Sequence, residues 1–205
     1  ISVLIPCYNE EENVVPMSEA VADIFAKELP EYEEIPCGCR MPTDVKNAYR
    51  RIESNFRQIM RSMSLGRKLQ STFLNLMTSY PDQPYDHAAI CHPKDGAELF
   101  APSNLDYADL PMPKDEDVIR IIGNKVSIGE RVIIYTPWTR LDTQTKLHRL
   151  LTQQGYRVRI LDNKVATSKR EQWVDNRVKE GIDVLIVNPS LVETGCASAR
   201  TPIPA

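Results

Sequence analysis

Apolar residues recur with two different periods along the C-terminal half of the chain. Short apolar runs at residues 131–135, 157–161 and 183–187 predict three strands. Between these runs, residues 141–154 and 168–181 carry apolar positions at the spacing of a helix. Strands that alternate with helices of this length predict an α/β protein with a parallel sheet and right-handed crossovers.

Capping residues and the third strand refine this pattern. Ser168 and Glu171 have the spacing of a capping box, in which each side chain bonds to the backbone amide of the other residue, so we expect them to open the second helix. Gly155 and Gly181 are placed to end the two helices. The run 183–187 is almost entirely apolar, as is typical of a strand covered on both faces.

The chain before the sheet is predicted to be helical and then irregular. Residues 43–63 and 66–80 have apolar positions at steps of three and four, which predicts two helices, and Thr43 is a suitable N-cap for the first. Residues 81–117 hold six of the fifteen prolines, so we expect an irregular connection that is the least ordered internal stretch. A helical pattern returns over residues 117–126.

The first residues predict a further unit. Residues 1–5 have the pattern of a strand, and residues 11–29 that of a helix with a broad apolar face. We therefore expect a βα unit, a helical entry segment, the irregular connection, the core of the sheet and a tail. These segments span residues 1–34, 35–80, 81–117, 118–195 and 196–205.

The composition is that of an ordinary globular protein. Hydrophobic residues make up 42% of the chain and charged residues 26%, and 205 residues are enough to bury a core. No apolar run is long enough to span a bilayer, and the N-terminus lacks a signal-peptide pattern. The five cysteines are odd in number and do not suggest a disulfide framework, so we expect reduced thiols and a cytoplasmic protein.

Four residues have the chemistry of zinc ligands, namely Cys37, Cys39, Cys91 and His92. Their Cys-x-Cys and Cys-His spacings differ from those of structural zinc sites, which have about two to four residues between paired ligands. We expect ordinary thiols at these positions and no metal site.

Charge is distributed unevenly around the net value of −3. Residues 1–34 hold nine acids and one base, whereas residues 40–70 hold eight bases and two acids. Four of these bases fall on the polar side of the first predicted helix: Lys46, Arg50, Arg57 and Arg61. They form either a solvated basic face or a row of phosphate contacts, since guanidinium groups pair well with phosphate oxygens.

The ends of the predicted strands are the expected place for function. Ligands of open parallel sheets bind beyond the carboxyl ends of the strands. In this chain those ends are residues 136–139, 162–164 and 188–195.

Three sequences at these ends carry a resemblance to a known family. They read RVIIYTPWT, LLTQQGYRVRIL and VLIVNPSLVETG. In this order they resemble the second RecA-like lobe of superfamily 2 helicases and Swi/Snf-type translocases, most of all the helicase-like proteins of phages and mobile elements. Residues 135–139 match that family's motif IV and residues 188–195 its motif V, and a looser resemblance begins near Cys39. The resemblance implies a three-layer α/β lobe of the RecA-like kind.

The resemblance also implies contacts to the phosphodiester backbone of DNA. In this family, motif IV, the loop after the second strand and motif V touch the backbone through amides and hydroxyls. The matching residues here are Thr136, Thr139, Asn163, Lys164, Ser190 and Thr194. Motif V further implies nucleotide contacts at Glu193 and Gly195. As alternatives, the hydroxyls cap turns and helices, and Trp138 packs within the protein rather than stacking on a base.

The chain departs from this family where ATP is concerned. It has no Gly-x-x-x-x-Gly-Lys-Ser/Thr loop and no Asp-Glu-Ala-His-like box, which the family's first lobe supplies. After Gly195 it reads Cys-Ala-Ser where the family has a Leu-Asp-Leu run, and Arg200 lacks the context of the motif VI arginine. We therefore expect ATP and magnesium to bind only with a separate first lobe. The expected partners are duplex DNA and such a lobe, and no membrane.

The N-terminal residues resemble a different family. The sequence ISVLIPCYNEEENV resembles the first strand, loop and helix of family 2 glycosyltransferases, which implies nucleotide-sugar contacts at Pro6, Tyr8 and Glu10. The resemblance stops near Glu34, where that family continues into an Asp-Asp-Gly-Ser turn. We expect no acidic motif that holds a divalent ion, so residues 1–34 are best explained as a βα unit packed on a neighbouring sheet.

Together these patterns predict a truncated C-terminal lobe of an ATP-dependent DNA helicase or translocase. It is preceded by a glycosyltransferase-like unit, through a natural or artificial fusion, and the first residue, Ile1, fits a fragment. We expect backbone binding without autonomous ATP hydrolysis. Two alternatives stay open: a nucleotide-sugar-binding glycosyltransferase fragment and a ligand-free interaction domain.

Overall fold

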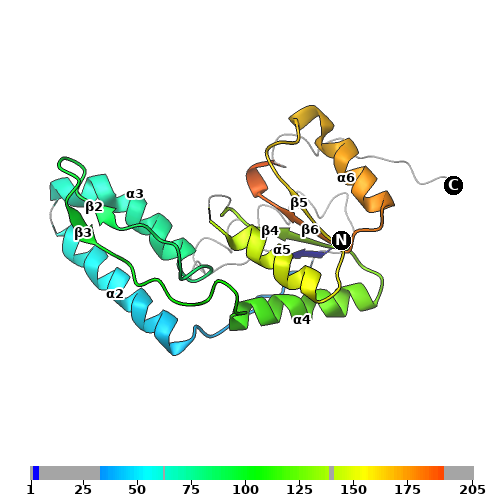
Figure 1. Cartoon of the computed structure of the whole chain (residues 1–205), viewed down its shortest axis with the longest axis horizontal. Helices are drawn as coiled ribbons and strands as arrows, with labels where there is room; N and C mark the ends of the chain where they lie inside the picture. Colours follow the sequence, from blue (N-terminus) through cyan, green and yellow to red (C-terminus); the bar gives the residue numbers. More distant parts are fainter. Residues whose placement is uncertain (1, 5–32, 62, 139–140, 192–205) are drawn as a thin grey trace.

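The computed structural model describes residues 2–4, 33–61, 63–138 and 141–191. A helical part and a part built on a parallel sheet lie beside each other (Figure 1). No helix in these described ranges is both long and apolar enough to cross a membrane.

The larger sheet is parallel throughout. Its strands stand in the order β1–β4–β6–β5. They are β1 (Ser2–Leu4), β4 (Val132–Tyr135), β5 (Val158–Leu161) and β6 (Val184–Val187). This arrangement confirms the predicted α/β class, and it places the first strand of the chain at one edge of the sheet, beside β4.

Helices cover the sheet on both faces. They are α4 (Pro113–Ser127), α5 (Thr143–Gln153) and α6 (Arg170–Lys179). On one face, Ile122 of α4 and Leu151 of α5 share a core with Ile186. On the other face, Trp173 of α6 packs in a core with Leu185. All four residues of β6 are buried, which confirms the prediction of a strand covered on both faces.

The start of α6 differs from the predicted capping box. Residues Thr167–Lys169 form a 3₁₀ turn, η1, and α6 begins at Arg170 with no side-chain hydrogen bond to its first amides. The Arg170 guanidinium donates instead to the Val165 carbonyl, at 3.2 Å. The predicted box of Ser168 and Glu171 is therefore wrong, because the 3₁₀ turn and Arg170 hold this entry.

Two helices and a short hairpin make up the helical part. They are α2 (Thr43–Met60), α3 (Met63–Ser79), β2 (Ile90–Cys91) and β3 (Glu98–Phe100). In their shared core, Phe73 is fully buried, with ring centroids 5.5 Å from Phe56 and 6.2 Å from Phe100. Both predicted helices are confirmed, but Thr43 is the first helical residue and not the N-cap, since the extended residue before the helix is Pro42.

The proline-rich connection is more ordered than the sequence suggests. It contains the β2–β3 hairpin, and α4 begins within it, at Pro113. The Tyr80 hydroxyl donates to the Ser103 carbonyl at 2.5 Å. Asn104 bonds to both the amide and the carbonyl of His87. The segment is irregular over most of its length, as predicted, and hydrogen bonds and apolar side chains tie it to the helical core.

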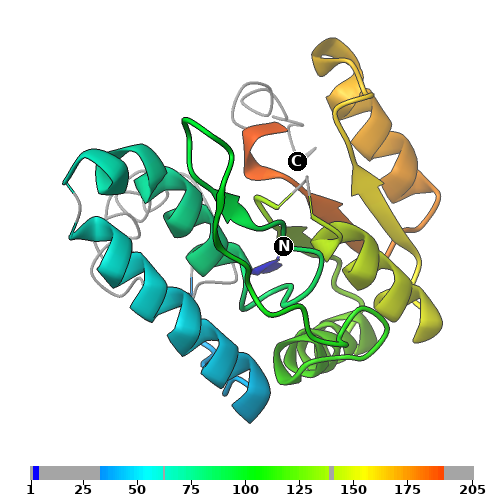
Figure 2. The same cartoon turned by 60° about the vertical axis from the view of Figure 1, so that its left-hand side comes forward.

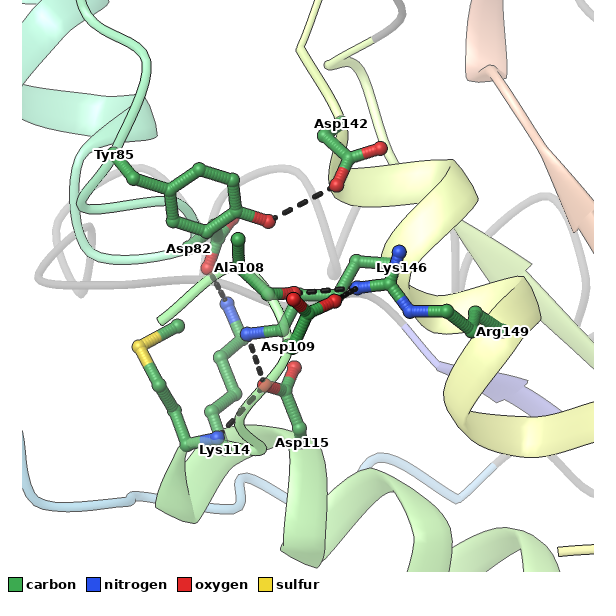
Figure 3. A network of polar contacts seen from close by, with 10 residues as sticks. Asp82, Tyr85, Ala108, Asp109, Lys114, Asp115, Asp142, Lys146 and Arg149 are labelled. Carbon is green, nitrogen blue, oxygen red and sulfur yellow. Dashed lines mark hydrogen bonds and ion pairs between the residues drawn. The ribbon is translucent and has the colours of Figure 1, made fainter. Parts of the chain in front are cut away.

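Buried charge links the two parts, as Figure 3 shows. Lys114 and Asp115 are neighbours at the start of α4 but pair with different elements. The Lys114 ammonium pairs with Asp82, just after α3. Asp115 Oδ2 accepts from the Met112 amide at 2.9 Å and lies 2.8 Å from the Lys146 ammonium on α5. The Lys146 ammonium and the Asp115 carboxylate are poorly aligned for a hydrogen bond. Charge attraction therefore holds this pair, which is almost fully buried from solvent.

Tyr85 and Arg149 complete the link. The Tyr85 hydroxyl donates to Asp142 Oδ2 at 3.2 Å, and its ring centroid lies 5.9 Å from the Lys146 ammonium. Burial and then the Asp142 carboxylate raise the pKa of Tyr85, so its hydroxyl keeps the proton that it donates. Arg149 donates to the Ala108 carbonyl at 2.5 Å. The loop before α4 is thus fixed to α5.

A second clamp ties the amino ends of β5 and β6. Asp183 accepts from the Arg157 amide at 2.8 Å, and from its guanidinium Nε at 3.1 Å and Nη2 at 2.8 Å. Gly181 makes room for this side chain, because a Cβ there would lie 2.6 Å from Arg157 Nη1. Its φ of +80° also favours glycine at this helix end.

Lys146→Met tests the buried pair of α4 and α5. Methionine has a similar length but leaves the Asp115 carboxylate buried without its counter-charge, so we expect a loss of about 3–5 kcal/mol in the free energy of unfolding. Urea denaturation followed by circular dichroism measures it. Thr145→Met, at the exposed neighbouring position, is the control and should change the midpoint little. A Lys146→Met midpoint equal to that of the control would contradict a role for the pair.

Asp183→Asn tests the clamp through its pH dependence. Hydrogen bonds from Arg157 lower the pKa of Asp183 below its ordinary value of 3.8, so the folded chain favours the carboxylate. Its stabilisation is present above that ordinary pKa and is lost as the pH falls through the lowered one. We expect Asp183→Asn to lower the urea midpoint at neutral pH and to match the wild type in acid. Asp175→Asn, at an exposed position of α6, is the control. If Asp183→Asn lowered the urea midpoint by the same amount in acid as at neutral pH, the role of the clamp would be contradicted.

Candidate nucleic-acid interface at the carboxyl edge of the sheet

Three loops leave the sheet at the same level. Tyr135 and Leu161 are both paired with Val187, so the last residues of β4, β5 and β6 stand in one row. The Thr136 amide donates to the Val187 carbonyl at 3.0 Å and extends the ladder by one residue. The loops after β4, β5 and β6 therefore begin side by side, as expected for parallel strands.

Asn188 ties the loop after β4 to the loop after β6. It is buried, and its Nδ2 donates to the Pro137 carbonyl at 3.1 Å. Its Oδ1 accepts from the Ser190 amide at 2.8 Å and from the Ser190 hydroxyl at 2.6 Å. One side chain thus fixes two of the three loops.

Arg170 ties the loop after β5 to the loop after β6. Its Nε donates to the Val165 carbonyl at 3.2 Å, and its Nη1 donates to the Leu191 carbonyl at 2.8 Å. The sequence prediction did not include Asn188 or Arg170 among the site residues. A strand-end asparagine followed by Pro and Ser is a recognisable turn signal for Asn188, whereas no local pattern marks Arg170.

Trp138 connects this edge to the helical part. Its indole nitrogen donates to Asp82 Oδ2 at 3.2 Å, and the other Asp82 oxygen pairs with Lys114. Burial raises the pKa of Asp82, while Lys114 and Trp138 oppose this by favouring the carboxylate. The structure therefore uses the half-buried Trp138 for packing between the two parts.

The predicted contact residues differ in their exposure. Asn163 and Lys164 are exposed in a turn that Asp162 closes, because its carboxylate accepts from the Lys164 amide at 2.9 Å. Ser190 is also exposed. The structure brings these side chains to the same edge of the sheet, on two of the three loops.

Thr136 has a different place from the one predicted. Only 1% of its surface is exposed, and its hydroxyl accepts from the Trp138 amide at 3.4 Å. It shapes the loop after β4, and burial removes it from direct contact with a ligand. The other predicted contacts lie outside the described residues: Thr139, Thr194, Glu193, Gly195, Pro6, Tyr8 and Glu10.

Metal-binding chemistry is not assembled in the part of the chain that the structure describes, where no three His, Cys, Asp or Glu residues gather around one point. His92, one of the weighed zinc ligands, pairs with Asp95 at 2.9 Å. An Asp-x-Asp spacing does occur in α4, at Asp115 and Asp117. The first pairs with Lys146 and the second with Arg120, at 2.8 Å each.

A hollow of about 280 Å³ lies at the opposite, amino edge of the sheet. Arg131, Arg157 and Asp183 are among the residues that line it. Because Asp183 already binds the Arg157 guanidinium, the cationic side of this hollow is largely neutralised. The carboxyl edge is the better candidate site.

Comparison with known proteins adds no assignment. The chain matches no protein-family model, no curated protein and no solved structure.

Asn188→Ala tests whether one side chain holds two loops of this edge. We expect faster exchange of the Thr136, Trp138, Ser190 and Leu191 amide hydrogens, because both ties are lost. Asn188→Asp is the matched control, since it keeps the acceptor for Ser190 but has no donor for the Pro137 carbonyl. It should loosen the loop after β4 more than the loop after β6. Unchanged exchange in Asn188→Ala would contradict the role of Asn188.

Proposed function

We propose that this chain is the second RecA-like lobe of a superfamily 2 type helicase or translocase, and that the carboxyl edge of its sheet binds the phosphodiester backbone of DNA. The observation that carries the proposal is the set of three adjacent loops, tied together by Asn188 and Arg170. Such ties fix polar groups in place before a ligand arrives, which lowers the entropy lost on binding.

The exposed side chains at this edge suit phosphate. Lys164 supplies a positive charge and Asn163 an amide donor, both on the turn after β5. The Ser190 hydroxyl now donates to Asn188 and can donate to a phosphate oxygen by rotating away. Contacts of this kind position a strand without reading its sequence.

ATP chemistry has no separate place in this proposal. The sequence contains no phosphate-binding loop of the Gly-x-x-x-x-Gly-Lys-Ser/Thr kind. ATP and magnesium would bind between this lobe and a first lobe that supplies that loop. The activity proposed for this chain is DNA binding, and coupling to ATP hydrolysis belongs to the pair of lobes.

Fluorescence anisotropy of a labelled DNA duplex tests the proposal. We expect saturable binding whose logarithm falls linearly with the logarithm of the salt concentration. Lys164→Gln should weaken binding and reduce that slope by about 0.9, the value for one lost phosphate contact on duplex DNA. A larger change would mean that the fold itself had altered.

Lys94→Gln is the matched control, because Lys94 is also exposed but lies in the turn of the β2–β3 hairpin. It should leave the salt slope unchanged. The proposal fails if the chain does not bind the duplex even at low salt, or if Lys164→Gln behaves as Lys94→Gln does.

A further inference from the structure

A strongly charged surface of the molecule lies on the α2–α3 pair. These helices and the residue Arg61 between them carry seven Lys or Arg and only two acids, Asp44 and Glu53. All seven bases are exposed, whereas the net charge of the whole chain is −3. The excess of positive charge is thus concentrated on one small part of an otherwise acidic protein.

Four of the bases form a row, which we call the α2 row: Lys46, Arg50, Arg57 and Arg61. At about 100° per residue, they fall within about 60° of one another around the axis of α2, and they span about 22 Å along it. The buried residues Val45, Ala48 and Ile52 lie on the opposite side, against α3. Figures 1 and 2 both show α2 at the outer margin of the molecule, away from the sheet.

The α2 row is poorly neutralised within the protein. Arg57 pairs with Glu53 at 2.6 Å, but both side chains are exposed, 72% and 36%, so the pair is weak. Within the described ranges, none of the other three has an acidic partner within ion-pair distance. Lys46 and Arg50, like Arg57 and Arg61, are also four residues apart, where like charges destabilise a helix. A polyanion partner would relieve this repulsion.

The end of the row is extended by α3. Because α2 ends at Met60 and α3 begins at Met63, the exposed Arg67 and Lys68 lie near the same turn as Arg57 and Arg61. A row about 22 Å long spans about six of the phosphates that one strand of a duplex presents about every 3.4 Å along its axis. Guanidinium groups pair bidentately with phosphate oxygens, and three of the four residues in the row are arginines.

We propose that the α2 row is a second DNA-binding surface, which contacts the phosphate backbone of a duplex independently of the carboxyl edge of the sheet. This inference rests on the proposed function for its choice of partner, and extends it from the sheet to the helical part. The row positions the duplex and does not read its sequence, because its contacts are to phosphate alone.

The test compares two variants with the same change in charge. In the row variant, all four residues of the α2 row are replaced by Gln, which keeps helix propensity. In the control variant, four exposed or half-exposed bases elsewhere are replaced by Gln: Lys94, Arg120, Arg131 and Lys179. Circular dichroism and urea midpoints establish that both variants fold as the wild type does.

Duplex binding is then measured by anisotropy over a series of salt concentrations. We expect the row variant to lose about 3.6 units of the salt slope, about 0.9 for each of four phosphate contacts, and more than about tenfold in affinity at low salt. The control variant should keep the wild-type slope. A third variant, in which Arg50, Arg57 and Arg61 become Lys and Lys46 becomes Arg, keeps the charge and should keep most of the slope.

The outcomes separate this inference from the proposed function. If Lys164→Gln reduces the slope and the row variant behaves as its control, the α2 row is overturned and the sheet edge stands. If only the row variant loses binding, the sheet edge is overturned and the row stands. A wild-type chain that binds anionic phosphatidylserine vesicles through the row, but no duplex, overturns both and assigns the row to a membrane surface.

Discussion

The fold depends on two lysine–aspartate pairs that meet at the start of α4. Lys114 and Asp115 are adjacent in the chain, yet Lys114 pairs with Asp82 of the helical part and Asp115 pairs with Lys146 on α5. The first turn of α4 thus connects the core of the helical part to the core between the sheet, α4 and α5. Buried pairs add little net stability over apolar replacements, but losing one partner is costly, so they specify one arrangement of the parts.

That arrangement reaches the carboxyl edge of the sheet through Trp138. Its indole binds the same Asp82 carboxylate that pairs with Lys114, so the loop after β4 is held by the helical part. Asn188 then connects the loop after β4 to the loop after β6, and Arg170 connects the loop after β6 to the loop after β5. The exposed Lys164 therefore stands on a loop that Arg170 ties to the loop after β6, and the exposed Ser190 bonds directly to Asn188. A pre-formed polar edge of this kind would suit the proposed contacts to the DNA backbone.

Local patterns in the sequence predicted the elements well. Apolar periodicity alone located α2, α3, α5 and the strands β4 to β6. A helix with one buried face, or a fully buried strand, gives a regular pattern of apolar residues within a short window of sequence. Once these strands were predicted to be parallel, their carboxyl ends could be placed together at one edge of the sheet. The entry to α6 was mispredicted since a capping box is a local signal, whereas Arg170 at the start of this helix makes a tertiary contact to Leu191.

The ties within the candidate site could not be predicted. Asn188 and Pro137 are 51 residues apart, and Trp138 and Asp82 are 56 apart, so no window of sequence contains both partners. Burial of Thr136 was missed for a related reason, because the polar loop pattern does not show that the ladder continues one residue beyond β4. Order in the proline-rich connection likewise comes from distant partners, as between Asn104 and His87.

Nuclear magnetic resonance of the ¹⁵N-labelled chain, titrated with a short DNA duplex, shows directly whether the duplex binds at the carboxyl edge of the sheet. We expect the amide signals of residues 162–165 and those of Asn188, Ser190 and Leu191 to shift together and saturate at one duplex concentration. Signals at the amino edge, in residues 130–132 and 181–183, should stay in place. Binding that leaves both loops of the carboxyl edge unshifted would contradict the account.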